Sequence, residues 1–166
     1  MKISKKTAFL GLFTALALIL SFAEALLPPI FTYAPGIKIG LPNIIIIFLL
    51  YRFSLKSAAA VSLVRILITA MLFGSVVSLA YSIAGAVLSL TVMWLLKRLN
   101  AFSVPVISIV GAILHNIAQI FVAVALMGTS QLFYYLPILL LSGLISGVLV
   151  GVLSAYLIKV IKKVII

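Results

Sequence analysis

The chain is built of long apolar runs separated by short clusters of lysine and arginine. Only 8% of its residues are charged, whereas a soluble domain carries about 25% to cover its core with a surface compatible with water. The chain cannot build such a surface, so lipid must be its outer solvent. This feature alone selects the class of integral membrane proteins.

The apolar runs predict membrane-spanning helices. A helix needs about 20 predominantly apolar residues to cross the hydrocarbon core. Six runs approach or reach this length, at 7–27, 39–54, 57–73, 76–97, 104–127 and 134–160. Prolines at 28 and 29, glycines and basic residues interrupt them, because proline cannot continue a helix interior. The sequence predicts an all-α integral membrane protein, with residues 1–166 forming a single bundle of six transmembrane helices.

The basic residues predict the orientation of this bundle. Of the 12 lysines and arginines, all but Lys38 and Arg65 lie in the termini or in the loops after the second and fourth runs. Basic residues are retained on the cytoplasmic side of a membrane, so we expect both termini in the cytoplasm. A net charge of +11 in a soluble protein would favour a nucleic-acid partner. Here the cations lie between apolar runs, so membrane lipid is the expected partner and nucleic acid is not.

Several polar side chains fall inside or beside the predicted spans, where each is costly and needs a partner or a purpose. Arg65 lies in the middle of the third run. Three polar residues of the fifth run lie on nearly one helix face because they are three or four positions apart. The predicted substrate-binding residues are Glu24, Tyr33, Lys38, Asn43, Arg65, Tyr81, His115, Asn116 and Gln119.

These residues predict a pocket that opens to the outside beneath the proline-rich first loop. It would accept a small molecule with anionic or polar groups. In the alternative, Arg65 pairs with Glu24 and the polar residues of the fifth run only hold helices together, through contacts worth about 1 kcal/mol or less each. The residues leave both interpretations open. For His115 we expect a neutral hydrogen-bonded side chain, because no second His or Cys exists to complete a metal site.

The sequence argues against catalysis. It contains no phosphate-binding glycine loop, so the chain does not hydrolyse ATP by itself. Its one acidic residue, Glu24, cannot supply paired acids or a carboxylate cage for a metal. We therefore predict no enzyme activity, no catalytic residue, no metal and no cofactor. Coupled carriers usually show several intramembrane carboxylates or broken, repeated helices, which disfavours a self-sufficient secondary carrier but leaves it open.

Three segments resemble one bacterial family: Pro-Gly-x-Lys-x-Gly at 35–40 with its continuation to Asn43, the residues 64–67, and 111–119 with His-Asn-x-x-Gln. The family is known as Gx transporter or as heptaprenyl diphosphate synthase component I, and the similarity runs over nearly the whole chain. It looks like the S components of energy-coupling factor (ECF) transporters. Those are six-helix bundles of the cell membrane that capture a vitamin or related micronutrient outside. The resemblance implies a shared transmembrane coupling subunit and two ATPases as partners.

Small residues of the first run gain a role from this resemblance. Ala8, Gly11 and Ala15 lie on one helix face, and small residues let helix backbones approach closely. S components typically carry an Ala-x-x-x-Ala-like motif there for docking on the coupling subunit. Gly11 and Ala15 match its spacing, with glycine in place of the first alanine. The resemblance therefore implies a partner-binding face.

The synthase name conflicts with the chemistry of the chain. Prenyl diphosphate synthases use Asp-rich motifs, and this chain contains no aspartate. Our leading hypothesis is an S component of an ECF-type importer that captures a small polar or anionic micronutrient. The alternatives are a non-catalytic membrane anchor for a prenyl diphosphate synthase and the self-sufficient carrier.

Overall fold

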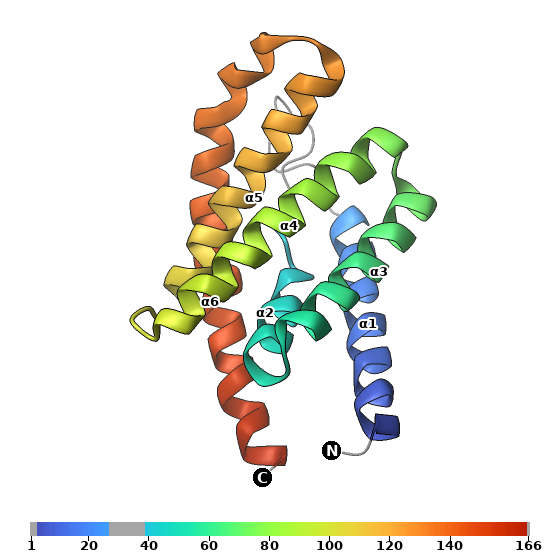
Figure 1. Ribbon diagram of the computed structural model, residues 1–166, viewed down its shortest axis with the longest axis vertical. Helices are drawn as coiled ribbons and strands as arrows, with labels where there is room; N and C mark the ends of the chain where they lie inside the picture. The colour runs from blue at the N-terminus through green and yellow to red at the C-terminus, as the bar shows by residue number, and fades with distance from the viewer. Residues whose placement is uncertain (1–2, 27–38, 166) are drawn as a thin grey trace.

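The computed structural model describes residues 3–26 and 39–165. In chain order the elements are α1 (Ile3–Leu26), α2 (Asn43–Arg52), α3 (Leu55–Phe73), α4 (Val76–Leu99), α5 (Val104–Met127), the short 3-10 helix η1 (Ser130–Tyr135) and α6 (Leu136–Ile165). No strand occurs in this part of the chain. The predicted all-α fold is confirmed. Figure 1 shows α5 beside α6, α4 crossing them, α1 beside α3, and α2 in the middle.

Local signals set the ends of most helices. Ser54 and Ser75 precede α3 and α4, and each hydroxyl accepts a hydrogen bond from the backbone N–H three residues later, at 3.2 Å and 3.1 Å. The Ser78 hydroxyl in turn accepts a bond of 2.8 Å from the Ser75 N–H, which completes a capping box. Gly128 ends α5 with φ at 66°, a conformation that glycine adopts without steric cost. Such signals are visible in sequence, and the predicted ends of α3, α4 and α5 agree with the structure within two residues.

The second predicted span is wrong in length. We predicted a helix over 39–54, but α2 covers only 10 residues, Asn43–Arg52. Gly40 adopts a positive φ of 80°, and Pro42 lies at the N-cap, so residues 39–42 cannot be helical. Ten residues of helix rise about 15 Å, roughly half of a hydrocarbon core of about 30 Å. Five helices of the described chain, rather than the predicted six, are long and apolar enough to span a membrane.

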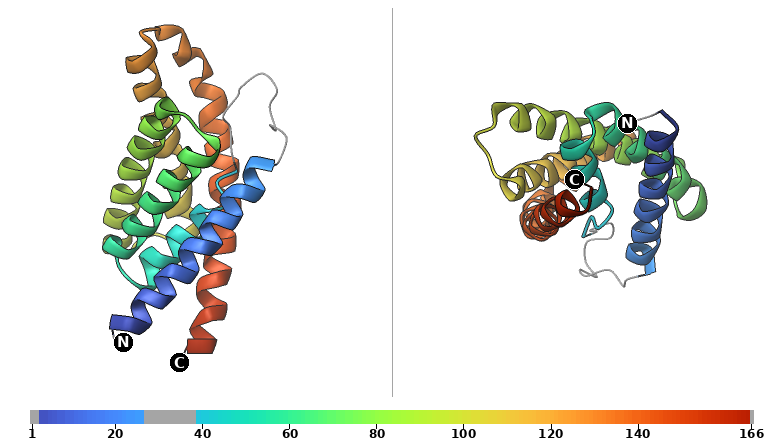
Figure 2. Two further views of the ribbon diagram at one scale, coloured as in Figure 1. Left: turned by 90° about the vertical axis from the view of Figure 1, so that its right-hand side faces the viewer. Right: turned by 90° about the horizontal axis from the view of Figure 1, so that it is seen from below.

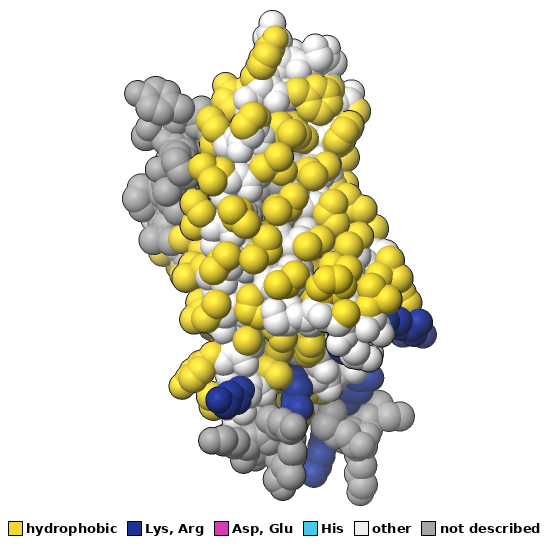
Figure 3. Space-filling model, turned by 90° about the vertical axis from the view of Figure 1, so that its left-hand side faces the viewer, with side chains coloured by type: hydrophobic (Ala, Val, Ile, Leu, Met, Phe, Trp, Pro, Cys, Tyr) yellow, Lys and Arg dark blue, Asp and Glu magenta, His cyan; other side chains and the backbone are white. Residues whose placement is uncertain are grey.

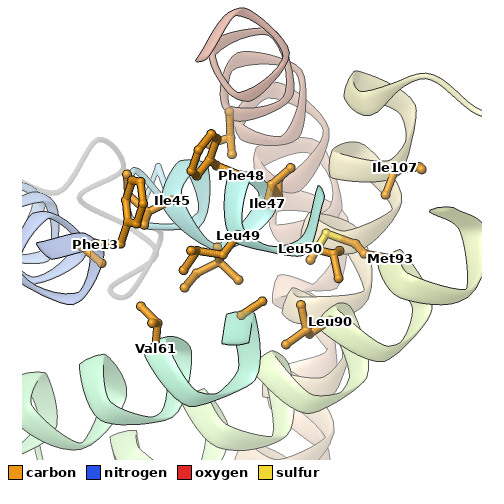
Figure 4. Packing of buried hydrophobic residues seen from close by; sticks show 14 residues of the cluster. Phe13, Ile45, Ile47, Phe48, Leu49, Leu50, Val61, Leu90, Met93 and Ile107 are labelled. Carbon is orange, nitrogen blue, oxygen red and sulfur yellow. The ribbon is translucent and has the colours of Figure 1, made fainter. Parts of the chain in front are cut away.

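The core forms around α2. Its residues from Ile45 to Leu50 are all buried, as expected for a helix that is apolar on every side. Figure 4 shows these side chains surrounded by Phe13 of α1, Val61 of α3 and Met93 of α4. The helix therefore uses its apolarity to fill the interior of the bundle and not to contact lipid.

The basic residues gather at one end of the molecule. Both termini lie at this end in Figure 1, and Figure 3 shows lysines and arginines there below an extended hydrophobic surface. Lys97 Nζ donates a hydrogen bond of 2.7 Å to the carbonyl of Leu50 and lies 5.1 Å from the centre of the Tyr51 ring. The hydrogen bond of Lys97 thus connects the end of α4 to the end of α2. The cytoplasmic position of this basic end stays a prediction.

Candidate ligand-binding site

A cavity of about 530 Å³ lies within the bundle, with most of its wall toward the end away from the termini. Its wall is formed by the end of α1, the first half of α2, the second half of α3, α4 as far as Met93, and parts of α5 and α6. The volume falls within the range of about 300–1,000 Å³ that is usual for small-molecule sites. The described part of the chain therefore contains space for a ligand within the bundle.

The cavity brings together residues that are far apart in the sequence. Seven of the nine predicted substrate-binding residues line it, namely Glu24, Asn43, Arg65, Tyr81, His115, Asn116 and Gln119. The other two, Tyr33 and Lys38, lie outside the described residues. Placement in the wall makes the seven available to a ligand; their role in binding stays a prediction.

Arg65 is the most exceptional residue of the wall. It lies on α3 beside the cavity, and its Nε is buried with no hydrogen-bond partner in the described part of the chain. The charge of Glu24 acts on Arg65, but no ion pair joins the two within the part of the chain that the structure describes. The Glu24 carboxylate instead accepts a hydrogen bond from the Gly40 N–H. Direct pairing of Arg65 with Glu24, the structural alternative from the sequence, is therefore not what the structure shows.

His115 is fixed by a close backbone contact. A Cβ atom added to Gly85 would approach the His115 ring within 2.8 Å, so only glycine leaves room for the imidazole there. His115 makes a hydrogen bond with the backbone of Gly85, in line with the hydrogen-bonded side chain that we expected. Among residues 3–26 and 39–165, no group of three His, Cys, Asp or Glu residues lies close enough to hold a metal ion.

Asn116 and Gln119 differ in their hydrogen bonding. The Asn116 Nδ2 donates to the Leu139 carbonyl at 2.7 Å and approaches Ser142 Oγ at 3.5 Å. Asn116 thus ties α5 to α6, as the structural alternative proposed for this helix. Gln119 also lines the cavity, and none of the described residues forms a hydrogen bond with its side chain. Its amide remains available to a ligand.

Sequence reasoning missed part of the cavity wall. Thr69 lies one turn after Arg65, and its Oγ1 is likewise buried without a partner. The spacing of four residues on one predicted helix was the signal that could have identified it. The cavity also extends along α5 as far as Ser108, eleven residues from Gln119 or about 16 Å of helix. This serine, with Ser89 and Ser146, adds hydroxyl groups to that part of the wall.

The predicted partner-binding face is open in the structure. Ala8, Gly11 and Ala15 are all exposed on α1, and nothing lies within 4 Å of a Cβ atom added at Gly11. The glycines of α6 behave differently, because an added Cβ at Gly147 or Gly151 would come within 2.6 Å of an α5 backbone atom. The α6 glycines therefore serve packing inside the bundle, while the small residues of α1 face outward. Figure 2 shows how much of α1 the other helices leave uncovered.

One known protein family matches most of this chain. The model of the family described as heptaprenyl diphosphate synthase component I matches residues 13–157. The chain belongs to this family. The match includes part of every α-helix and the described cavity wall. No match to the chain was found among curated proteins or among solved structures.

The family description agrees with the chemistry of the chain. "Component I" names one part of a synthase rather than the complete catalyst. The chain has one acidic residue and no aspartate, so it lacks the paired acids that such catalysis needs. The family description is therefore consistent with the prediction that this chain is not itself an enzyme. The chain is a multi-pass membrane protein of a family whose members are named as parts of a larger assembly.

Proposed function

We propose that this chain is a non-catalytic membrane subunit that captures a small polar or anionic molecule in its cavity. The observation that carries the proposal is Arg65, a half-buried cation in the wall of a ligand-sized space, whose buried Nε has no hydrogen-bond partner among the described residues. An ionisable side chain inside a membrane bundle is costly unless it has a partner or a task. A ligand that enters the cavity provides that partner.

The expected orientation gives the direction of capture. Basic loops remain in the cytoplasm, and much of the cavity wall comes from the ends of α1 and α3 and the start of α4, away from the basic end. The cavity would then be loaded from the outer side of a bacterial cell membrane. This supports uptake or sensing of an external compound.

The family description favours one assembly, a heptaprenyl diphosphate synthase. In a synthase assembly, the chain is the membrane component and a separate protein carries the catalytic carboxylates. The basic end, with Lys56 and Arg98 exposed, would face a soluble catalytic partner in the cytoplasm. The cavity could hold an isoprenoid-related anion, since it combines Arg65 with apolar wall residues such as Ile66 and Val150.

The cavity and the open face of α1 favour a second assembly, an ECF-type importer. An S component needs a binding pocket that faces outward and a helix face on which the coupling subunit can dock. The cavity and the exposed residues Ala8, Gly11 and Ala15 fit these two needs. The partners would be a transmembrane coupling subunit and two ATPases, because this chain has no nucleotide-binding motif.

Affinity purification of the tagged chain from its native membrane, in mild detergent, tests the proposal. Mass spectrometry would identify the proteins and the small molecules that remain bound. A bound small molecule together with a coupling subunit and ATPases supports the importer. A bound small molecule together with a prenyltransferase supports the synthase component. A chain that carries no small molecule in either assembly would refute ligand capture.

Two variants distinguish the role of the cavity in ligand binding from the role of the exposed α1 face in partner binding. We expect Arg65→Gln to lose the small molecule and to keep its protein partners. In an importer, Gly11→Leu should keep the small molecule and lose the protein partners, because the added side chain blocks the exposed face of α1. Nothing in the described chain lies within 4 Å of a Cβ atom added at Gly11. Retention of all partners by Gly11→Leu would favour the synthase assembly.

A further inference from the structure

We infer that the ligand of this cavity carries an oxyanion, a carboxylate or a phosphate, which binds between Arg65 and Thr69. The inference rests on the proposed function and names the chemical class of the ligand. Arg65 and Thr69 are four residues apart on α3 and share one face. Both line the cavity, and both have a buried polar atom without a partner.

The number of unused donors points to a ligand rich in acceptors. A guanidinium has five N–H donors and no acceptor. None of the described residues forms a hydrogen bond with Arg65, and Nε and Thr69 Oγ1 are shielded from solvent as well. Leaving such groups unpaired in a protein interior is unfavourable, most of all for a charged one. Both residues line the cavity, so a ligand in it lies beside the Arg65 guanidinium and the Thr69 hydroxyl.

Three polar groups of the wall already make hydrogen bonds elsewhere. Glu24 accepts from the Gly40 N–H, His115 bonds the backbone of Gly85, and Asn116 donates to the Leu139 carbonyl. Glu24 supplies a counter-charge nearby but no hydrogen bond to the guanidinium. None of these three groups forms a hydrogen bond with the guanidinium in the described chain, so a ligand that brings its own acceptors can complete Arg65.

An oxyanion satisfies this site better than a neutral acceptor. A neutral carbonyl would leave the charge of Arg65 uncompensated by any direct contact in a medium of low dielectric. Carboxylates and phosphates accept two parallel N–H bonds from one guanidinium, which is the geometry that arginine recognises. The hydroxyl of Thr69 adds one more donor on the same side.

The remaining wall describes the rest of the ligand. Ile47, Ile66 and Val150 line the cavity, and Met93 lies at its deep end against Gly111. These side chains offer apolar contact beyond the polar group. The ligand class is an amphipathic oxyanion of small size, with its charged group at Arg65.

Thermal unfolding of the purified full-length chain in detergent tests the inference. The probes are inorganic phosphate, inorganic pyrophosphate and succinate, each compared with sodium chloride at equal ionic strength. A ligand that binds only the folded state stabilises it in proportion to the logarithm of its concentration. We expect at least one oxyanion to raise the Tm, by roughly 5 °C when it is present far above its Kd. Phosphate and pyrophosphate against succinate distinguish the two kinds of oxyanion.

Matched variants locate the effect. Arg65→Gln should abolish the rise in Tm, and Arg65→Lys should reduce it because lysine lacks the forked donors. Thr69→Val should weaken the response several-fold, while Thr69→Ser, which keeps the hydroxyl, should retain it. If Arg65→Gln does not fold, the Arg65→Lys variant and the Thr69 pair decide.

Three results would overturn the inference. The wild type responds to no oxyanion more than to chloride; or a folded Arg65→Gln responds like the wild type; or Thr69→Val responds like the wild type, in which case the Thr69 hydroxyl takes no part in binding. The small molecule retained after purification provides an independent test. A neutral retained molecule refutes the oxyanion but leaves ligand capture intact, whereas the complete absence of a retained molecule refutes the proposed function itself.

Discussion

Individual residues of the cavity wall perform different tasks although they look alike in sequence. Asn116 and Gln119 are both amides on nearly one face of α5. Asn116 Nδ2 donates a hydrogen bond of 2.7 Å to the Leu139 carbonyl. The Gln119 amide forms no hydrogen bond with the described part of the chain. The difference comes from the position of α6, which reaches one residue and not the other. Spacing along α5 alone could not reveal it.

This difference predicts opposite phenotypes for two alanine variants. Asn116→Ala should lower the free energy of unfolding by about 1 kcal/mol, the usual worth of an interhelical polar contact. Gln119→Ala should leave stability nearly unchanged and reduce the amount of small molecule retained after purification. Thermal unfolding in detergent and mass spectrometry measure the two effects. An equal loss of stability in both variants would contradict the assignment.

At the scale of whole helices, α2 and the α5–α6 pair hold the bundle together. The helix α2 is too short to span the membrane but fills the interior beside the basic end. The pair α5–α6 comes into close contact because glycines face α5, and small residues permit such an approach. Both elements lie under the cavity or form part of its wall. Their packing therefore decides whether the cavity keeps its shape.

The burial of α2 predicts a large effect for a leucine that no solvent reaches. Leu50 is 0% exposed and Leu12 of α1 is 56% exposed. Leu50→Ala should cost about 2–5 kcal/mol because it leaves a void, and Leu12→Ala should change stability by no more than about 0.5 kcal/mol. Thermal unfolding of the two variants in one detergent provides the comparison. Similar losses would mean that α2 is not the centre of the core.

The glycines predict a second contrast between helices. An alanine at Gly147 would bring its Cβ within 2.6 Å of the Ile109 Cα, so α5 and α6 must separate. We expect Gly147→Ala to lower the Tm by several degrees. Gly11→Ala, where nothing lies within 4 Å of the added atom, should unfold at the wild-type temperature. A wild-type Tm for Gly147→Ala would show that the helix pair adjusts without cost.

At the scale of the whole molecule, charge separates the two ends. The basic residues and both termini lie at one end, and the cavity lies toward the other. A hydrophobic surface connects the ends, as lipid requires. This polarity links the position of the ligand to the side of the membrane from which it comes.

The absence of cysteine from the sequence makes this orientation easy to test. A single cysteine at Ser130, the first residue of η1 at the far end, should react with a membrane-impermeant maleimide in intact cells. A single cysteine at Lys56, at the basic end, should react only after the cells are permeabilised. Both residues are exposed, so the protein itself shields neither from the reagent. The reverse pattern would place the cavity on the cytoplasmic side.

The site could be predicted in outline but not in detail. Polar residues inside apolar runs are few, so Arg65 and His115 were identifiable from the sequence by their cost alone. Thr69 was missed because a threonine inside a membrane helix is common and inexpensive. Its significance comes from a buried hydroxyl beside an unpaired guanidinium, which is a property of the folded wall.

Composition and local patterns were enough to establish the class of the protein, its helical nature and the gathering of its basic residues at one end. These follow from solvent chemistry and local rules, since apolar runs need lipid and backbone groups in lipid need helices. The folded chain was needed to show that α2 is a buried core helix and that Arg65 Nε has no hydrogen-bond partner. It was needed as well to show that Asn116 ties two helices while the glycines of α6 face α5. These features depend on which helices pack against each other. The spacing of residues along a single helix does not reveal contacts between segments that are distant in the sequence.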